Sequence, residues 1–215
     1  SFPSKVAFLK ENIEVQGRTD IVKQIKNLMN FSRFYLPEIF PEVSSGLYMD
    51  TDMLVFSDLS VLETYFPFPD GKLAKAPLIF PLEAMKFAPS LKIAGKGFNA
   101  GFYLFDLTVW RKEGLTTQAE KWMLRHREEK LFNLGTQPIV NLLFYQRCLD
   151  LDKHWNVRGY ATYEMPKSKH SKTFVAHWNG SKKPWMPECP NKEIWKAFSL
   201  PFEKLKFEKT KGDRV

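Results

Sequence analysis

The sequence has little cysteine, no long hydrophobic run and no internal repeat. Cys148 and Cys189 are its only cysteines, so no disulfide framework can be read and neither their pairing nor the compartment follows from cysteine content. No run of about 18 apolar residues occurs, which excludes a membrane-spanning helix in this sequence. No charged start followed by a short apolar segment and a small-residue cleavage site is present, so no signal peptide is predicted.

The composition is that of one globular domain. The 215 residues, 44% of them hydrophobic, provide enough apolar material for one core and are too few for two ordinary enzyme domains. Nineteen Phe, six Trp and seven Tyr are spread along the chain without a repeat, which favours a packed core over a platform for stacking bases. We expect this domain to span residues 1–200.

The formal net charge of +8 would attract phosphate, whether on a nucleic acid, on a membrane or on a small nucleotide. Five of the basic residues lie in residues 201–215, which we predict to be a solvated basic tail. A basic nucleic-acid-binding module is an alternative, but no RNA-binding or DNA-binding motif supports it. RNA binding with a steep salt dependence that survives Asp52→Ala would favour that alternative.

Alternating helices and short buried strands predict an α/β fold around a mostly parallel sheet. Helical spacing covers residues 20–36, which end before Pro37, and residues 116–130, with Thr116 or Thr117 as the N-cap. One short apolar strand is predicted from residues 46–49 and 53–56, with an interruption at residues 50–52, and a second strand is predicted at residues 102–105. Residues 57–97 contain five prolines and are expected to be rich in loops.

Two acidic residues, Asp50 and Asp52, interrupt the first apolar strand. Residues two apart on an extended chain project to the same side, and where the strand ends both carboxylates can turn onto one cation. Oxygen ligands of this kind suit Mn²⁺ or Mg²⁺, which in turn bridges a diphosphate. A pair of acids in a turn is the ordinary alternative, but the position directly after an apolar strand favours a metal site.

A second candidate site lies between His177 and Trp185. The imidazole of His177 can complete a metal site, Gly180 allows a phosphate to approach the backbone, and Lys183 supplies a positive charge. A hydrogen-bonded core histidine and a solvated lysine are the ordinary readings of the same residues.

Four ordered motifs resemble glycosyltransferase family 8: Phe31 to Pro37, Tyr48 to Asp52, Phe98 to Gly101 and His177 to Trp185. Within that family the chain is most similar to the animal glycosyltransferase 8 domain-containing proteins, through Leu115 to Met123, Trp155 to Arg158 and the His-Trp-Asn-Gly run from His177. Plant galacturonosyltransferase-like proteins are the next most similar.

The resemblance implies a GT-A fold, with a mixed, mostly parallel sheet flanked by helices. It also implies retaining transfer of a sugar from a UDP-sugar donor. Asp50, Asp52 and His177 would hold Mn²⁺ or Mg²⁺. Asn99 would line the sugar pocket, and the remaining donor contacts would come from Arg33, Gly180 and Lys183.

Two departures from the family pattern bear on activity. The family commonly has Gly-Asp-Gln near the reacting carbon, whereas this chain has Thr136 between Gly135 and Gln137. Gln137 stays a candidate catalytic residue beside Asn99. Only about thirty residues precede the Phe31 motif, so we expect the first strands of the domain to be missing. A catalytically silent member that binds only donor or partner is therefore the alternative function.

The resemblance also suggests partners and a location. The expected partners are the UDP-sugar donor and a glycan or glycoprotein acceptor, with no nucleic acid. The expected location is the Golgi lumen, as the ectodomain of a type II membrane protein whose anchor is absent from this chain. Asn30 begins a formal glycosylation sequon, and we expect it to be buried and unmodified.

Overall fold

The computed structural model of the protein describes residues 29–85, 87, 89–132 and 135–198. The described residues form a four-stranded sheet in the order β1-β6-β3-β7, a three-stranded sheet in the order β2-β9-β8 and the pair β4-β5. The strands are β1 (Ser45–Met49), β2 (Met53–Val55), β3 (Ala74–Ala76), β4 (Leu78–Pro81), β5 (Lys96–Phe98), β6 (Phe102–Asp106), β7 (Cys148–Asp150), β8 (Val157–Arg158) and β9 (Val175–His177).

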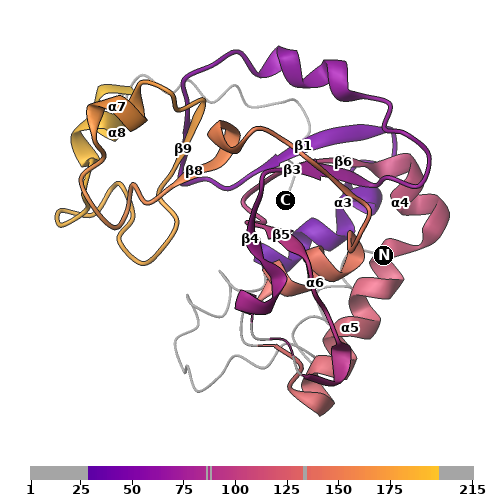
Figure 1. Ribbon diagram of the computed structural model, residues 1–215. Helices are drawn as coiled ribbons and strands as arrows, with labels where there is room; N and C mark the ends of the chain where they lie inside the picture. The colour runs from indigo at the N-terminus through magenta and orange to yellow at the C-terminus, as the bar shows by residue number, and fades with distance from the viewer. Residues whose placement is uncertain (1–28, 86, 88, 133–134, 199–215) are drawn as a thin grey trace, which may run out of the picture.

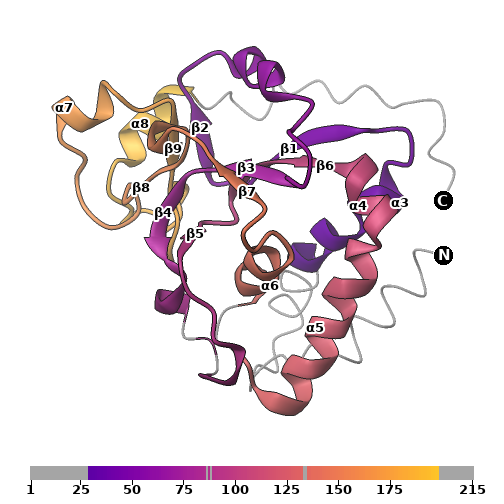
Figure 2. The same cartoon turned by 45° about the vertical axis from the view of Figure 1, so that its right-hand side comes forward.

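Helices gather on one face of the four-stranded sheet, below it in Figures 1 and 2. They are α3 (Leu36–Ile39), α4 (Leu107–Glu113), α5 (Leu115–Glu129) and α6 (Thr136–Leu143), with the 3₁₀ turn Ser32–Tyr35 leading into α3. The short helices α7 (Lys167–His170) and α8 (Lys192–Phe198) lie beside β8 and β9, at the left of Figure 1. None of the described helices is long and apolar enough to cross a bilayer.

Strand β6 separates the largest cluster of buried side chains from a second cluster. Tyr103 and Phe105 belong to the cluster packed beneath the helices, whereas Phe102 and Leu104 belong to a cluster on the opposite face, with Trp155. Successive side chains of a strand point to opposite faces, so a strand covered on both sides has to be apolar throughout. The predicted strand at residues 102–105 is confirmed, and burial on both faces explains its composition.

The expectation of a mostly parallel sheet is wrong for the described residues. Four of the strand pairs are antiparallel, and only β3 with β7 and β8 with β9 are parallel. Parallel neighbours in sequence need a long crossover, usually a helix between the strands. Here α4, α5 and α6 follow one another between β6 and β7, and a three-residue turn joins β1 to β2. Mixed sheets flanked by helices are confirmed.

The two predicted helices are partly confirmed. Most of residues 20–36 lies outside the described residues, and the described part stays helical through Ile39, because Pro37 occupies the first turn of α3, where a missing N–H is tolerated. Helix α5 matches residues 116–130, but the predicted threonine cap is wrong. The helix begins after Gly114, and the Thr116 hydroxyl instead donates to the Phe34 carbonyl at 2.7 Å.

Two smaller expectations can also be compared with the structure. Asn30 is exposed, so the expected burial of the sequon is wrong. The basic tail at residues 201–215 lies outside the described residues. Cys148 and Cys189 are both free.

The hydroxyl of Tyr103 is the one buried side-chain polar atom among the described residues that has no hydrogen-bond partner. Burial keeps it neutral by raising its pKa. Because an unsatisfied buried hydroxyl is unfavourable, we expect Tyr103→Phe to raise the free energy of unfolding by about 1 kcal/mol in chemical denaturation. Tyr160→Phe is the matched control, since the Tyr160 hydroxyl is hydrogen-bonded to His170 and Thr173, and it should lower stability. Equal losses in both variants would contradict the prediction.

Candidate metal centre

The turn from Asp50 to Asp52 carries the chain from one sheet into the next. Asp50 follows the last residue of β1, and its amide donates to the Gly101 carbonyl at 2.8 Å, just before the start of β6. Asp52 precedes β2, and its carbonyl accepts from the Trp178 amide at 2.9 Å, beyond the end of β9. The predicted single strand is therefore two strands of different sheets, and both ends of the turn are fixed by backbone hydrogen bonds.

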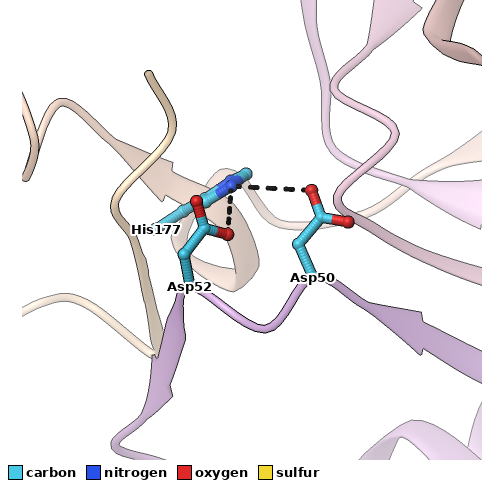
Figure 3. A group of neighbouring side chains, drawn as sticks. All are labelled: Asp50, Asp52 and His177. Atoms are coloured by element: carbon cyan, nitrogen blue, oxygen red, sulfur yellow. Dashed lines mark ion pairs between the residues drawn. The ribbon is translucent and has the colours of Figure 1, made fainter. Parts of the chain in front are cut away.

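His177 faces both carboxylates, as Figure 3 shows. It is the last residue of β9 and pairs with Met53 of β2, which places its ring beside the turn. Its Nε2 lies 3.3 Å from Oδ1 of Asp52 and 3.8 Å from Oδ2 of Asp50. One ligand atom from each residue lies within 4.8 Å of the other two. Two carboxylate oxygens and an imidazole nitrogen converging in this way fit a divalent cation such as Mn²⁺ or Mg²⁺.

Lys183 binds the more buried of the two carboxylates. Asp52 is 5% exposed, and its Oδ2 accepts a hydrogen bond from Nζ of Lys183, which also donates to the Trp178 carbonyl at 3.3 Å. Burial would raise the pKa of Asp52, but the hydrogen bonds and charges of His177 and Lys183 outweigh it and hold that pKa below its ordinary value. Asp52 is thus held in the ionised form that a metal requires.

Arg33 supports the other carboxylate from inside the protein. It is 4% exposed, and it donates to the Ala100 carbonyl and the Tyr48 hydroxyl, both at 2.7 Å, and to Oδ1 of Asp50 at 3.4 Å. Its guanidinium also lies 4.2 Å from the centre of the Tyr48 ring. Burial, opposed by Arg33 and reinforced by Asp50, raises the pKa of Tyr48 to about 12, so its hydroxyl stays a neutral partner. The donors of Arg33 are engaged by protein groups.

A chain of amide side chains joins His177 to the start of α6. Oδ1 of Asn156 accepts a hydrogen bond from Nδ1 of His177 at 2.9 Å, and Nδ2 of Asn156 donates to Oδ1 of Asn99 at 3.2 Å. Asn99 in turn donates to Oε1 of Gln137 at 3.0 Å. Because Asn156 engages Nδ1, the Nε2 face of the imidazole is left toward the carboxylates, which is the usual arrangement around metal-binding histidines.

Two glycines near the site stand where another residue would be unfavourable, one because of space and one because of its backbone conformation. A Cβ at Gly101 would lie 2.6 Å from Cε1 of His177 and 2.7 Å from Oδ2 of Asp50. Only glycine therefore lets the turn between β5 and β6 pass so close to the site. Gly180 has a φ of 122°, a conformation that L side chains rarely adopt. The loop after His177 therefore turns at a position that requires glycine.

The comparison with protein families decides the identity of this fold and site. The family model described as Glycosyl transferase family 8 matches residues 8–189, most of the chain. The chain belongs to glycosyltransferase family 8. Among curated family members, Glycosyltransferase 8 domain-containing protein 1 of Xenopus tropicalis is 28% identical, over 91% of this chain and 61% of its own length. Probable galacturonosyltransferase 9 of Arabidopsis thaliana is 30% identical, over 80% of this chain and 33% of its own length.

Solved structures of glycosyltransferases share the fold. The galactosyltransferase LgtC, solved with donor and acceptor sugar analogues, superposes with a TM-score of 0.62 over 82% of this chain and 69% of its own, at 20% identity. GlyE of Streptococcus pneumoniae gives a TM-score of 0.60 over 80% of this chain and 43% of its own, at 24% identity. The chain therefore has the GT-A fold, and it spans about three fifths of the length of the Xenopus relative.

The structure of this family 8 chain brings most of the predicted site residues together. Asp50, Asp52, His177 and Lys183 are in direct contact, and Arg33 reaches them from behind Asp50. Asn99 and Gln137 bind each other and connect to His177 through Asn156. Gly180 lies three residues after His177, exposed, with no contact to the carboxylates in the described residues.

Sequence reasoning missed three residues of this site in the family 8 chain. Asn156 lies inside the Trp155 to Arg158 motif, but an asparagine before a valine carries no signal of binding a distant histidine. Gly101 closes the Phe98 motif, where the glycine itself was the available signal. Tyr48 lies two residues before Asp50. Its position in the apolar strand that leads to the acids was the one signal in the sequence that could have indicated it.

Lys183 and a metal would compete for Asp52. A carboxyl whose pKa is lower in the folded state adds stability above its ordinary pKa, and that stability is lost as pH falls below about 4. We expect Lys183→Met to lower the free energy of unfolding by about 1–2 kcal/mol at neutral pH, with a smaller loss in acid, because Lys183 is 32% exposed and the pair is partly screened. Mn²⁺ should bind the variant more tightly than the wild type and restore its melting temperature.

Lys182→Met is the matched control for this prediction. It removes the same charge from the adjacent, exposed position, which makes no ion pair in the described residues. Thermal unfolding with and without Mn²⁺, at neutral and acid pH, should separate the two variants. If both behave alike, the contact between Lys183 and Asp52 has no special role.

Asn156 should matter for metal binding without touching the metal. Asn156→Leu removes the partner of His177 Nδ1, and we expect a loss of roughly 10–100-fold in Mn²⁺ affinity, as for other groups that orient metal ligands. Asn156→Asp keeps the oxygen toward the imidazole and should retain most of the affinity. Isothermal titration calorimetry with Mn²⁺ measures both. An Asn156→Leu variant that binds Mn²⁺ like the wild type would overturn this role.

Proposed function

We propose that the protein is a retaining glycosyltransferase that uses a UDP-sugar donor and a divalent metal, Mn²⁺ or Mg²⁺. The observation that carries the proposal is the convergence of Asp50, Asp52 and His177, whose ligand atoms lie within 4.8 Å of one another beside a lysine. Family 8 membership supports the reaction type, and the donor and the metal are inferred from this arrangement together with the resemblance described above.

The chain's own residues would prepare the site for a diphosphate. When bound, the metal supplies positive charge against the diphosphate as it leaves the sugar. Asn156 holds the imidazole of His177, and Arg33 holds the carboxylate of Asp50, so neither ligand has to reorganise. Lys183, once displaced from Asp52, would donate to a phosphate oxygen, and the positive φ of Gly180 would let the phosphate approach the backbone.

Asn99 and Gln137 would act at the sugar. Their amides bind each other at 3.0 Å, and Asn99 is linked through Asn156 to the metal ligand His177. A sugar placed over this pair would be held in a fixed relation to its diphosphate, which lowers the entropic cost of reaching the transition state. In the transfer, the bond from the anomeric carbon to the diphosphate oxygen would break, an acceptor hydroxyl oxygen would bond to that carbon, and the proton of that hydroxyl would pass to the departing diphosphate.

The competing proposal is a silent member that binds a donor without transferring it. Thr136 motivates it, because a hydroxyl stands where the family commonly has an acid. The side chain of Thr136 is 8% exposed at the first residue of α6, next to Gln137. A buried hydroxyl carries no charge toward the sugar, so the two proposals differ in chemistry and agree on donor binding.

The acceptor is proposed to be a glycan or a glycoprotein. The proposed location is the Golgi lumen, as the ectodomain of a type II membrane protein, and it rests on the family resemblance. It stays a prediction, as do the extent of the domain over residues 1–200 and the solvated character of residues 201–215.

The deciding experiment is calorimetric titration of UDP into the chain with and without Mn²⁺. We expect binding only with the metal, and loss of binding in Asp52→Asn and His177→Ala, since each variant removes one ligand. Asp70→Asn is the matched control, because Asp70 is exposed, lies in a turn and makes no ion pair in the described residues. Release of UDP from UDP-sugars then separates a transferase from a silent member.

The outcomes are distinct. Binding that needs Mn²⁺, with release of UDP, supports the transferase. Binding that needs Mn²⁺, with no release from any UDP-sugar tested, favours the silent member. UDP binding that is unchanged in Asp52→Asn and His177→Ala would place the nucleotide elsewhere and overturn the proposed site.

A further inference from the structure

A cavity of about 540 Å³ opens beside the metal centre. It is lined by the segment that runs from Lys153 through Gly159 and by parts of β4 and α7, and the elements β8 and α7 lie at the left of Figure 1. Its volume falls in the range of roughly 300–1,000 Å³ that is typical of small-molecule sites. None of Asp50, Asp52, His177 or Lys183 lines it, so the cavity is separate from the proposed diphosphate position.

Two residues join the cavity to the metal centre. Asn156 lines the cavity and also binds Nδ1 of His177 at 2.9 Å. Asn179, two residues after His177, lines it too, and its Oδ1 accepts from the Gly159 amide at 3.3 Å. A ligand in the cavity would therefore lie next to the residues that orient the metal ligand, where a second substrate has to approach.

The lining of the cavity is strongly cationic. Lys153, Arg158, Lys169 and Lys172 line it, and no aspartate or glutamate does. His154 also lines it and is paired with the Asp152 carboxylate at 2.6 Å, which places one acid near the rim. Four cations against that single carboxylate leave a concave surface of one sign, which concentrates anions and repels cations.

Arg158 is the cation that most needs a partner. It is half-buried on β8, and within the described ranges it makes no ion pair. Its guanidinium lies 5.4 Å from the centre of the Phe80 ring, which fixes it on the cavity wall, and burial lowers its pKa. A charge that has lost part of its hydration without gaining a counterion is unfavourable. An anion bound in the cavity would compensate the positive charge of the guanidinium.

We propose that this cavity binds the acceptor through an acidic group, a carboxylate or a sulfate ester on a sugar. The proposal rests on the proposed transferase function and adds the chemical class of the acceptor. Arg158 would bind the acidic group with paired N–H donors, and Lys153 and Lys172 would supply further positive charge. A neutral sugar would leave these cations uncompensated, so the cavity would discriminate by charge.

The test uses four small probes with UDP and Mg²⁺ present: methyl β-glucuronide and its neutral partner methyl β-glucoside, and N-acetylgalactosamine 6-sulfate and its unsulfated form. Saturation-transfer NMR measures their binding to the wild type and to three variants. Lys153→Gln/Lys172→Gln removes two exposed charges, and Arg158→Gln removes the half-buried one. Lys112→Gln/Lys121→Gln is the matched control, with two exposed lysines on α4 and α5.

We expect at least one acidic probe to bind more tightly than its neutral partner. Each cavity variant should weaken that binding by roughly tenfold, since hydrogen bonds to charged groups are among the stronger ones, whereas the control should leave it unchanged. The two acidic probes distinguish a carboxylate from a sulfate, and preference for either supports the proposal. UDP titrated in parallel should bind all four proteins equally.

Several results would overturn the proposal. Equal binding of acidic and neutral probes, or equal losses in the cavity and control variants, would show that the cavity does not recognise acidic sugars, and normal UDP binding would leave the proposed function intact. Acidic-probe binding that appears only when UDP is left out would assign the cavity to the donor. Binding of acidic probes by a chain that binds no UDP would instead overturn the proposed transferase function. The assignment of the cavity to the acceptor would then fail as well.

Discussion

The structure depends on placing two carboxylates at the junction of two sheets. Asp52 is nearly buried there, and an isolated ionised carboxylate in such a place would be strongly destabilising. Lys183 and His177 compensate Asp52, and Arg33 does the same for Asp50 from the protein side. The turn that presents the acids is itself fixed by backbone hydrogen bonds to the ends of β6 and β9. A divalent cation would enter a site whose ligands are already oriented.

A chain of hydrogen-bonded amide side chains leads from the metal centre to the start of α6. The side chains of Asn156, Asn99 and Gln137 carry no charge. Asn156 donates a hydrogen bond to Asn99, and Asn99 donates one to Gln137. Such a chain is rigid because losing one link would leave buried polar groups unsatisfied. The parts of the site that would face the diphosphate and the sugar therefore belong to one network, although His177 and Asn99 lie 78 residues apart in the sequence.

The site is divided between two packing units of the fold. The four-stranded sheet and helices α3 to α6 form the largest cluster of buried side chains, and the carboxylates lie at the edge of that sheet. The segment around β8, β9 and α7 packs around its own buried cluster with Trp178 and Tyr160, and it supplies both His177 and most of the cationic cavity. A change in that segment could alter the acceptor while the carboxylate turn stays the same. This division suits a family whose members share a fold and differ in their substrates.

Local patterns were enough to predict several elements correctly. The apolar run at residues 102–105 has to be a strand buried on both faces, and the spacing in residues 116–130 gives α5. Asp50 and Asp52 stand out because acids in an apolar strand need a cation. Pattern reasoning failed where long-range pairing decides: strand direction depends on which strands meet, and Thr116 binds the Phe34 carbonyl across the fold instead of capping its own helix.

The sequence by itself determined the residue types that can hold a metal and a diphosphate, because oxygen and imidazole ligands and a lysine can be read directly from it. Only the tertiary structure decided that these groups meet. It also placed Asn156 behind His177, left space for them at Gly101 and gathered Lys153, Arg158, Lys169 and Lys172 around one cavity. The physical reason is that the contacts between these groups join residues far apart in the chain, and packing and sheet pairing, which act across the whole fold, set those distances.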